Sequence, residues 1–403
     1  MHVIAYADRV NITFAETEIR SDLGISATVF GLAAGIFFLS YVALEIPSNL
    51  VLHRVGARLW MGRIMISWGI VATATAFVWD GASLVVARIL LGVGEAGFFP
   101  GVVYLLACWF PERDRGRAMS VFMLGIVAAA VVGGPLSGAL LELDGVLGLE
   151  GWQWLFIGQG LPAVAVGFWV LRVLPGSPAE APWLPAAERA ALEGELAEEA
   201  ASRPAFTLRG ALTDRRILRC ALVYFTINFA SYGTIFWAAD IIERIGDVEG
   251  IELGLLVGIP MALGSTGLIV IGRRSDRSGD RRRWTVIGML LGAAGLAGTA
   301  LLPAEAGVVT LGVCAFGLLG AIPAFWAMPT SLLTGRPMAG GVALVNTIGV
   351  SGGIFGPVVV GAAKDAGSLE AGLGVLAAVL VCGAGLAARL PFAARRMAGP
   401  AWV

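Results

Sequence analysis

The chain has 403 residues, of which 57% are hydrophobic and only 14% are charged, and its formal net charge is −1. Soluble domains carry about a quarter charged residues, so this composition excludes a soluble protein and indicates a chain surrounded by lipid. The near-neutral charge also excludes a general basic surface for nucleic acid. Two histidines and four scattered cysteines form neither a metal-ligand cluster nor CxxC spacing, so we expect no cofactor, no metal and no enzymatic site.

Apolar runs dominate the chain. A membrane-spanning helix needs about 20 largely apolar residues. The runs of this kind lie at 1–18, 28–52, 61–79, 83–109, 117–142, 153–174, 217–242, 252–272, 284–302, 306–333, 339–364 and 369–391. The first run is the weakest because Asp8 follows so soon after Met1, and we expect the true first helix to begin about 15 residues upstream. The sequence therefore predicts an all-α polytopic membrane protein with twelve transmembrane helices.

Basic residues concentrate in alternate loops, and such loops face the cytoplasm. The loops assigned to that side are 53–60, 110–116, 175–216, 273–283, 334–338 and the tail 392–403. Both termini are then cytoplasmic, and we expect a multi-pass protein of a bacterial inner membrane.

The stretch 175–216 is the only long linker. It begins with four prolines and continues at 188–201 with ERAALEGELAEEAA, a good helix former. It divides the chain into an N-terminal six-helix bundle (1–174), a cytoplasmic linker and a C-terminal six-helix bundle (217–403). Two bundles around a central cavity are the layout of a secondary transporter. A twelve-span channel and a membrane enzyme are the alternatives.

Two loops at equivalent places in the bundles are alike. The second reads Gly272-Arg-Arg-Ser-Asp276-Arg277-Ser-Gly279-Asp-Arg281, and it resembles in full the G-x-x-x-D-R-x-G-x-R loop of the major facilitator superfamily. The first, Asn49-Leu-Val-Leu-His53-Arg54-Val-Gly56-Ala-Arg58, departs from it at Asn49 and His53. The resemblance implies a role in the inward gate for the charged members of these loops, with positive-inside anchoring as the alternative. These members are Arg54, Arg58, Asp276 and Arg277.

Six further segments follow the same order as in one family of that superfamily. They are 6–12, 41–50, 88–101, 109–113, 151–156 and 340–349. Together they resemble the anion:cation symporter family, which includes bacterial permeases for tartrate, phthalate, 4-hydroxyphenylacetate and sugar acids. The resemblance implies the major facilitator fold and transport of a small organic anion.

Charges within the spans are functional candidates, because burying a charge in lipid is costly. Asp8 and Arg9 are neighbours on a helix, so they point roughly 100° apart and do not face each other. Arg9 has a planar fork that binds a carboxylate with two hydrogen bonds, which leaves Asp8 to take a proton. A structural ion pair at the cavity edge is the alternative.

Arg88 and Glu95 lie two helical turns apart on one face, about 10 Å, too far for a direct bridge. Each therefore needs another partner. The resemblance implies that Glu95 is the second proton site, with a structural carboxylate as the alternative. Arg88 and Glu45 are assigned to gating or structure.

The remaining candidates are polar and aromatic. Tyr6 and Tyr41 either donate to a substrate oxygen or pack. Asn346 matches the family's substrate-contacting asparagine, with a packing hydrogen bond as the alternative. Ile126 stands where the sugar-acid carriers have a glutamine, so we expect a more apolar cavity suited to an aromatic or short aliphatic acid. The aromatic residues that suit it are Phe98, Phe99, Phe122, Phe236 and Trp237.

These observations predict a monomeric proton-coupled symporter that imports a small organic carboxylate by alternating access. Its partners are the substrate, protons and membrane lipid. The alternatives are transport of a neutral sugar or a drug, coupling to sodium, and a nontransporting sensor with the same fold.

Overall fold

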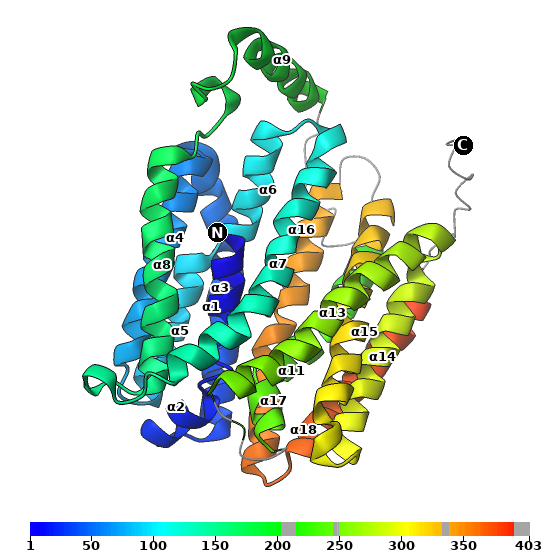
Figure 1. Cartoon of the computed structure of the whole chain (residues 1–403). Coiled ribbons are helices and arrows are strands. Elements are labelled where there is room, and N and C mark those ends of the chain that lie inside the picture. Colours follow the sequence, from blue (N-terminus) through cyan, green and yellow to red (C-terminus); the bar gives the residue numbers. More distant parts are fainter. Residues whose placement is uncertain (203–214, 245–247, 249, 333–337, 391–403) are drawn as a thin grey trace. The chain divides into compact units, whose positions relative to one another are not determined.

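The computed structural model describes residues 1–202, 215–244, 248, 250–332 and 338–390, although some side chains within these ranges are not described. This part of the chain is built of helices without strands (Figure 1). Eight of its segments are long and apolar enough to cross a membrane. The other four predicted spans, at 1–18, 61–79, 117–142 and 217–242, are also helical over most of their length. The prediction of an all-α membrane protein is confirmed.

The described residues form two compact units. The first comprises Met1–Asn11, Ile36–Ala129 and Leu140–Pro204. Its helices are α1 (His2–Asn11), most of α3 (Ala27–Val55), α4 (Ala57–Ala74), α5 (Gly81–Glu95), α6 (Phe98–Trp109), most of α7 (Glu112–Leu141), α8 (Gly151–Val173) and α9 (Ala186–Ser202). Glycines permit close helix packing here: a Cβ on Gly69 of α4 would stand 2.8 Å from the carbonyl oxygen of Gly160 on α8.

The second unit comprises Ile12–Gly35, Ala130–Ala139 and Ala205–Val403. Its helices are α2 (Glu16–Asp22), α11 (Arg215–Ile235), α12 (Ala238–Glu243), α13 (Gly250–Ser278), α14 (Arg281–Leu301), α15 (Gly307–Leu332), α16 (Met338–Val350), α17 (Gly352–Asp365) and α18 (Leu369–Ala388). Within it, α15 packs against α13 and α14, and α11 packs against α16 and α17. Two segments of the predicted first bundle belong to this unit, and the six-plus-six division stays a prediction.

Four predicted spans are interrupted. The run 1–18 is not one helix, because α1 ends at Asn11 and α2 begins at Glu16. The run 83–109 breaks between α5 and α6 at Gly97, whose φ of +87° lies in the left-handed region that favours glycine. The runs 217–242 and 339–364 break at 236–237 and at Ser351. Breaks of this kind expose backbone groups at the ends of short helices, where they become available to side chains or ligands.

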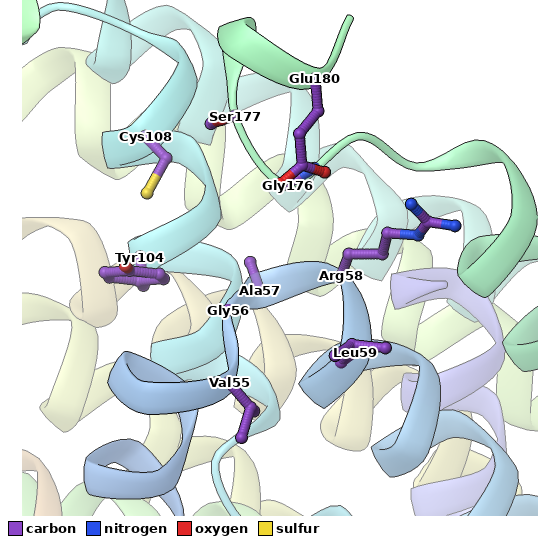
Figure 2. A pocket seen from close by; sticks show the side chains of 10 residues that line it. All are labelled: Val55, Gly56, Ala57, Arg58, Leu59, Tyr104, Cys108, Gly176, Ser177 and Glu180. Atoms are coloured by element: carbon purple, nitrogen blue, oxygen red, sulfur yellow. The ribbon is translucent and has the colours of Figure 1, made fainter.

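The first part of the linker folds onto the first unit. Trp183 stacks on Trp109 with ring centroids 5.7 Å apart, and the Trp109 indole donates to the carbonyl oxygen of Pro175 at 3.3 Å. The predicted helix at 188–201 is confirmed as α9. Beside this junction lies a pocket of about 480 Å³ (Figure 2). Its lining residues are Val55, Gly56, Ala57, Arg58, Leu59, Tyr104, Cys108, Gly176, Ser177 and Glu180.

Candidate functional site

Four ionisable side chains gather inside the first unit. Asp8 and Arg9 come from α1, and Arg88 and Glu95 come from α5. Asp8, Arg88 and Glu95 are almost completely buried, with at most 1% of each residue exposed. The side chain of Arg9 is 20% exposed. Charges at this depth need compensation from one another or from a ligand.

Arg9 forms an ion pair with Glu95, and the guanidinium donates a hydrogen bond to the carboxylate. The guanidinium also lies 5.5 Å from the ring centroids of Phe37 and Tyr41 on α3. Aromatic faces attract a cation without neutralising it. Arg9 therefore lies between the Glu95 carboxylate and two aromatic rings of α3.

Asp8 is fixed by two neutral donors. The Trp68 indole on α4 donates to one carboxylate oxygen at 2.5 Å, and the Asn11 side-chain amide donates to the other at 3.1 Å. Both donors satisfy a charged carboxylate without neutralising it. The carboxylate thus remains available to a proton.

Arg88 has the least compensated charge of the cluster. It is fully buried, yet its guanidinium nitrogens make no hydrogen bond to any residue that the structure describes. Its guanidinium carbon lies 5.4 Å from the ring centroid of Phe37, and it interacts electrostatically with Asp8 and Glu95. A buried cation without hydrogen bonds is costly, so Arg88 is retained at the expense of stability and supplies positive charge to both carboxylates.

Glycines bring α5 close to its neighbours. A Cβ on Gly92 would stand 2.4 Å from the carbonyl oxygen of Phe37, and one on Gly94 would stand 3.2 Å from the Cα of Trp68. This packing places Phe37 and Trp68 within reach of the charges.

The other predicted substrate residues are distributed over both units. Tyr41 is buried next to Arg9, and Tyr6 is half-buried on α1. Asn346 is half-buried on α16, in the second unit. The substrate role of each stays a prediction. Ile126, expected to line the cavity, lies outside the described side chains.

The predicted gating residues have varied surroundings. Glu45 is buried within α3, whereas Arg54 and Arg277 are exposed. Asp276 forms an ion pair with Arg281, five residues further along. Arg58 donates to the carbonyl oxygen of Leu171 at 2.7 Å. Their gating roles stay predictions.

The predicted cavity aromatics separate into two sets. Phe98, Phe99 and Phe122 belong to the first unit, where Phe122 stacks on the His2 ring at 4.0 Å. Phe236 and Trp237 belong to the second unit and are fully buried. Only the first set lies in the same unit as Arg9.

Two contributors to the site, Trp68 and Phe37, were absent from the sequence-based set. Both are aromatic residues within apolar runs, a pattern that usually means packing alone. The indole N–H of Trp68 is the one signal that pointed to a polar partner, because a buried indole normally finds an acceptor.

Residues 1–357 match the family model of the Major Facilitator Superfamily. The chain belongs to this superfamily. It is a multi-pass membrane transporter, and the superfamily fold implies twelve membrane-spanning helices.

Similar proteins indicate a family within the superfamily. The chain is 42% identical over 389 residues to a protein of Agrobacterium vitis provisionally named a tartrate transporter, covering 95% of this chain and 86% of the relative. It is 39% identical to a quinolone resistance transporter of Acinetobacter baumannii (95% and 89% covered). It is 38% identical to the inner membrane transport protein RhmT of Escherichia coli (95% and 90% covered). These relatives are consistent with the anion:cation symporter family.

The fold also has a solved counterpart. A crystal structure of a bacterial homologue of the human lysosomal transporter Spinster, in an inward-facing and unoccupied conformation, superposes with a TM-score of 0.77. The sequences are 19% identical, and the match covers 96% of this chain and 94% of that chain. At this identity the likeness concerns the fold alone.

Proposed function

We propose that the transporter imports a small organic carboxylate together with protons by alternating access. The observation that carries the proposal is the ion pair between Arg9 and Glu95 beside the buried carboxylate of Asp8. Arg9 binds the substrate carboxylate, while Glu95 and Asp8 take the protons. The charge bias of the loops supports an inner-membrane location with both termini in the cytoplasm.

The charges of the cluster explain why an anion and a proton bind together. Two carboxylates and two guanidinium groups sum to zero when all are charged. A substrate carboxylate that replaces Glu95 on Arg9 adds one negative charge to the cluster. Leaving one member of a buried pair without its partner costs about 3–5 kcal/mol, so Glu95 takes up a proton rather than remain charged and alone.

This exchange makes the coupling reciprocal. If the anion favours protonation of Glu95, protonation must favour the anion by the same factor. Outside, protonation releases Arg9 for the substrate. Inside, loss of the proton restores the Arg9–Glu95 pair and displaces the substrate. The cluster is neutral with one substrate carboxylate and a proton on Glu95, or with a dianion and protons on both Glu95 and Asp8. A neutral site is the state in which the bundles rearrange at least cost in a membrane.

A second candidate is the export of a drug. The relative named a quinolone resistance transporter favours it, since its identity to this chain is close to that of the tartrate relative. The buried Arg9–Glu95 pair does not separate the two, because proton coupling drives both uptake and export. The two candidates differ in the direction of transport and in the molecule that is carried.

Purified protein in proteoliposomes tests the proposal. A thermal-shift screen of carboxylates, including tartrate, phthalate and 4-hydroxyphenylacetate, selects the substrate, with glucose and a quinolone for comparison. We expect accumulation of a carboxylate under an imposed pH gradient, acid outside, and none under a sodium gradient. Accumulation of only the sugar or the quinolone, or dependence on sodium, would overturn the proposal.

A further inference from the structure

We propose that the ion pair between Lys364 and Glu16 is the reversible closure of the outer end of the transporter. It is made in the state seen here and broken in the state that receives substrate from outside. The outer end means the helix ends that the loop charges predict to face away from the cytoplasm. The inference rests on the proposed alternating access but not on the identity of the substrate.

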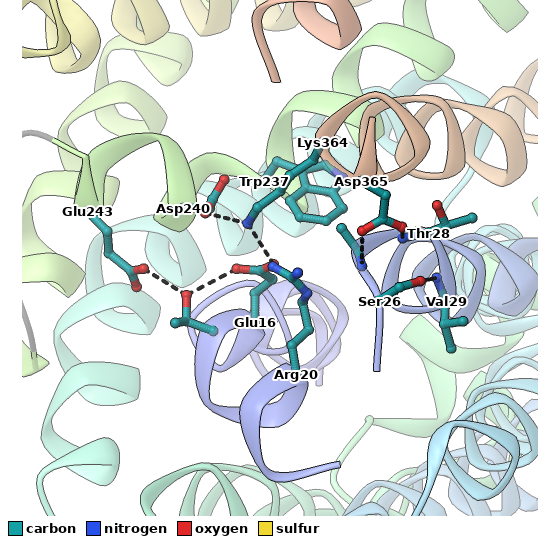
Figure 3. A network of polar contacts seen from close by, with 12 residues as sticks. Glu16, Arg20, Ser26, Thr28, Val29, Trp237, Asp240, Glu243, Lys364 and Asp365 are labelled. Carbon is teal, nitrogen blue, oxygen red and sulfur yellow. Dashed lines mark hydrogen bonds and ion pairs between the residues drawn. The ribbon is translucent and has the colours of Figure 1, made fainter. Parts of the chain in front are cut away.

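Lys364 lies between two carboxylates within the second unit (Figure 3). Its ammonium group is 3.1 Å from Oε1 of Glu16 and 2.5 Å from Oδ1 of Asp240. Glu16 comes from α2 in the predicted first bundle, whereas Asp240 on α12 and Lys364 on α17 come from the second. If the chain divides as predicted, Lys364 makes one ion pair between the two bundles and one within its own bundle.

Glu16, like Lys364, has a second ion-pair partner. Its Oε1 also accepts a hydrogen bond from Arg20 at 2.8 Å, one turn along α2. Only 1% of its side chain is exposed, against 16% for Lys364. Separation of Lys364 from Glu16 leaves Arg20 on Glu16 and Asp240 on Lys364, so neither charge loses all its partners.

The second partner of each charge allows the ion pair between Lys364 and Glu16 to break reversibly instead of joining the helices permanently. A buried ion pair whose members have no other partner costs about 3–5 kcal/mol to break from one side, which opposes a cycle. Here Arg20 remains paired with Glu16 and Asp240 with Lys364, and the separated charges are hydrated again. The bridge is therefore strong enough to hold the ends together and weak enough to release them in every cycle.

Neighbouring contacts also link segments of the two predicted bundles and can be released in the same way. The carboxylate of Asp365 accepts hydrogen bonds from the backbone N–H groups of Ala27 and Thr28, at 2.9 and 2.7 Å, and so caps α3 from another helix (Figure 3). The Thr13 hydroxyl donates to the carbonyl oxygen of Ile235 at 3.0 Å. On separation, all these polar groups are exposed to water, which replaces the lost hydrogen bonds.

The backbones of α3 and α17 touch just beyond this network. A Cβ on Gly31 would stand 2.5 Å from the carbonyl oxygen of Pro357, and one on Gly35 would stand 2.3 Å from that of Ile354. Small residues four apart allow such an approach. The ion pair thus stands over a close, apolar helix contact that excludes water while the end is closed.

The closure predicts opposite effects for two kinds of variant. Lys364→Gln or Glu16→Gln removes the bridge and favours the open outer end. Asp240→Asn or Arg20→Gln removes a resident partner, which leaves the bridge as the remaining strong ion pair and favours the closed end. A network that served stability alone would respond to all four changes in the same direction.

Thiol labelling from outside measures the open fraction. Thr13→Cys, in a background with the four native cysteines replaced by alanine, reports opening because Thr13 is only 2% exposed when its contact with Ile235 is made. A membrane-impermeant maleimide is added to intact cells without substrate. Arg244→Gln is the matched control, since Arg244 pairs with Glu370 at 2.9 Å within the second bundle and at the surface.

We expect Lys364→Gln to label about fivefold faster than the background, a ratio that corresponds to about 1 kcal/mol. Asp240→Asn should label more slowly, and Arg244→Gln should match the background. Unchanged labelling in Lys364→Gln, or faster labelling in both Lys364→Gln and Asp240→Asn, would overturn the closure. If Lys364→Gln does not fold, the labelling rates of Glu16→Gln and Arg20→Gln are compared instead. We expect faster labelling in Glu16→Gln and slower labelling in Arg20→Gln, and faster labelling in both would overturn the closure. Because no substrate is present, this result stands apart from the uptake assay.

Discussion

Arg9 and Glu95 are 86 residues apart in sequence and form a buried ion pair between α1 and α5. In the proposed mechanism, Glu95 is the carboxylate that the substrate replaces on Arg9. Asp8, one residue before Arg9, points instead to the neutral donors Trp68 and Asn11. The two carboxylates thus have different partners: Glu95 pairs with a cation, whereas Asp8 accepts hydrogen bonds from neutral donors.

Arg9→Lys tests the geometry of anion binding. Lysine keeps the charge but loses the planar fork that binds a carboxylate with two hydrogen bonds. Charge-assisted hydrogen bonds contribute about 1.5–3 kcal/mol, so we expect the affinity for the carboxylate to fall about tenfold to a hundredfold. Binding to purified protein by calorimetry measures it. Wild-type affinity in Arg9→Lys would place the anion elsewhere.

Glu95→Gln tests the proton role. Glutamine mimics the protonated acid, so Arg9 becomes free for substrate while the proton can no longer leave. We expect accumulation under a pH gradient to be lost and substrate exchange across proteoliposomes to persist. Asp8→Asn should behave alike if Asp8 carries the second proton. Accumulation retained in both variants would contradict the assignment.

Arg88→Gln tests whether this buried cation sets the pH range of transport. Removing a positive charge next to Asp8 and Glu95 favours the protonated acids, so their protons leave only at higher pH. The midpoint of the pH dependence of uptake should move upward by about one unit, equivalent to about 1.4 kcal/mol. Arg244→Gln is the control, because Arg244 lies in the second unit and pairs with Glu370 at 2.9 Å. An equal shift in both variants would argue against a specific role for Arg88.

Trp68→Phe makes a related but smaller change. It removes the indole donor that stabilises the charged form of Asp8 while it keeps an aromatic ring. We expect the same upward movement of the pH midpoint, measured in the same uptake assay. A lower rate without any movement of the midpoint would mean that Trp68 serves packing only.

Gly97→Ala tests the break between α5 and α6. The φ of +87° costs a residue with a side chain about 1–2 kcal/mol, and the added Cβ would stand 2.1 Å from the Ser48 hydroxyl oxygen. We expect a lower melting temperature of the solubilised protein. Gly374→Ala on α18 is the control, since a Cβ there meets nothing within 4 Å and alanine favours a helix by about 0.5–1 kcal/mol. A melting temperature unchanged or raised in Gly97→Ala would contradict this account.

Sequence reasoning predicted the helices well because apolar runs and loop charges are local signals. It missed the interruption of the run 1–18, where an apolar stretch gives way to the acidic start of α2 at Glu16. It identified all four charges of the cluster, since any charge within a span stands out. It predicted that Glu95 needs a partner from outside its own helix, and the structure pairs it with Arg9. That pair depends on how α1 and α5 pack, which sequence spacing does not encode. The outside partner expected for Arg88 stays a prediction.

The ion pairs of Lys364 with Glu16 and Asp240 could not be predicted from the sequence either. Lys364 and Glu16 read as ordinary polar residues at span ends, where water normally solvates a charge. Only the fold reveals that one lysine is shared between two carboxylates from distant segments. Trp237 likewise reads as a cavity aromatic, yet it is fully buried and its ring lies 5.0 Å from the Lys364 ammonium group.

The central claim is that anion binding and protonation are coupled through Arg9 and Glu95. Proton uptake on ligand addition tests it most directly: purified protein in weak buffer near neutral pH is mixed with tartrate, or with the tightest ligand of the carboxylate screen, and the pH is followed with a soluble indicator. The account predicts that the wild type takes up protons as it binds the anion, and that the Asp8→Asn/Glu95→Gln double variant binds it without proton uptake. Binding by the wild type with no proton uptake would contradict the account.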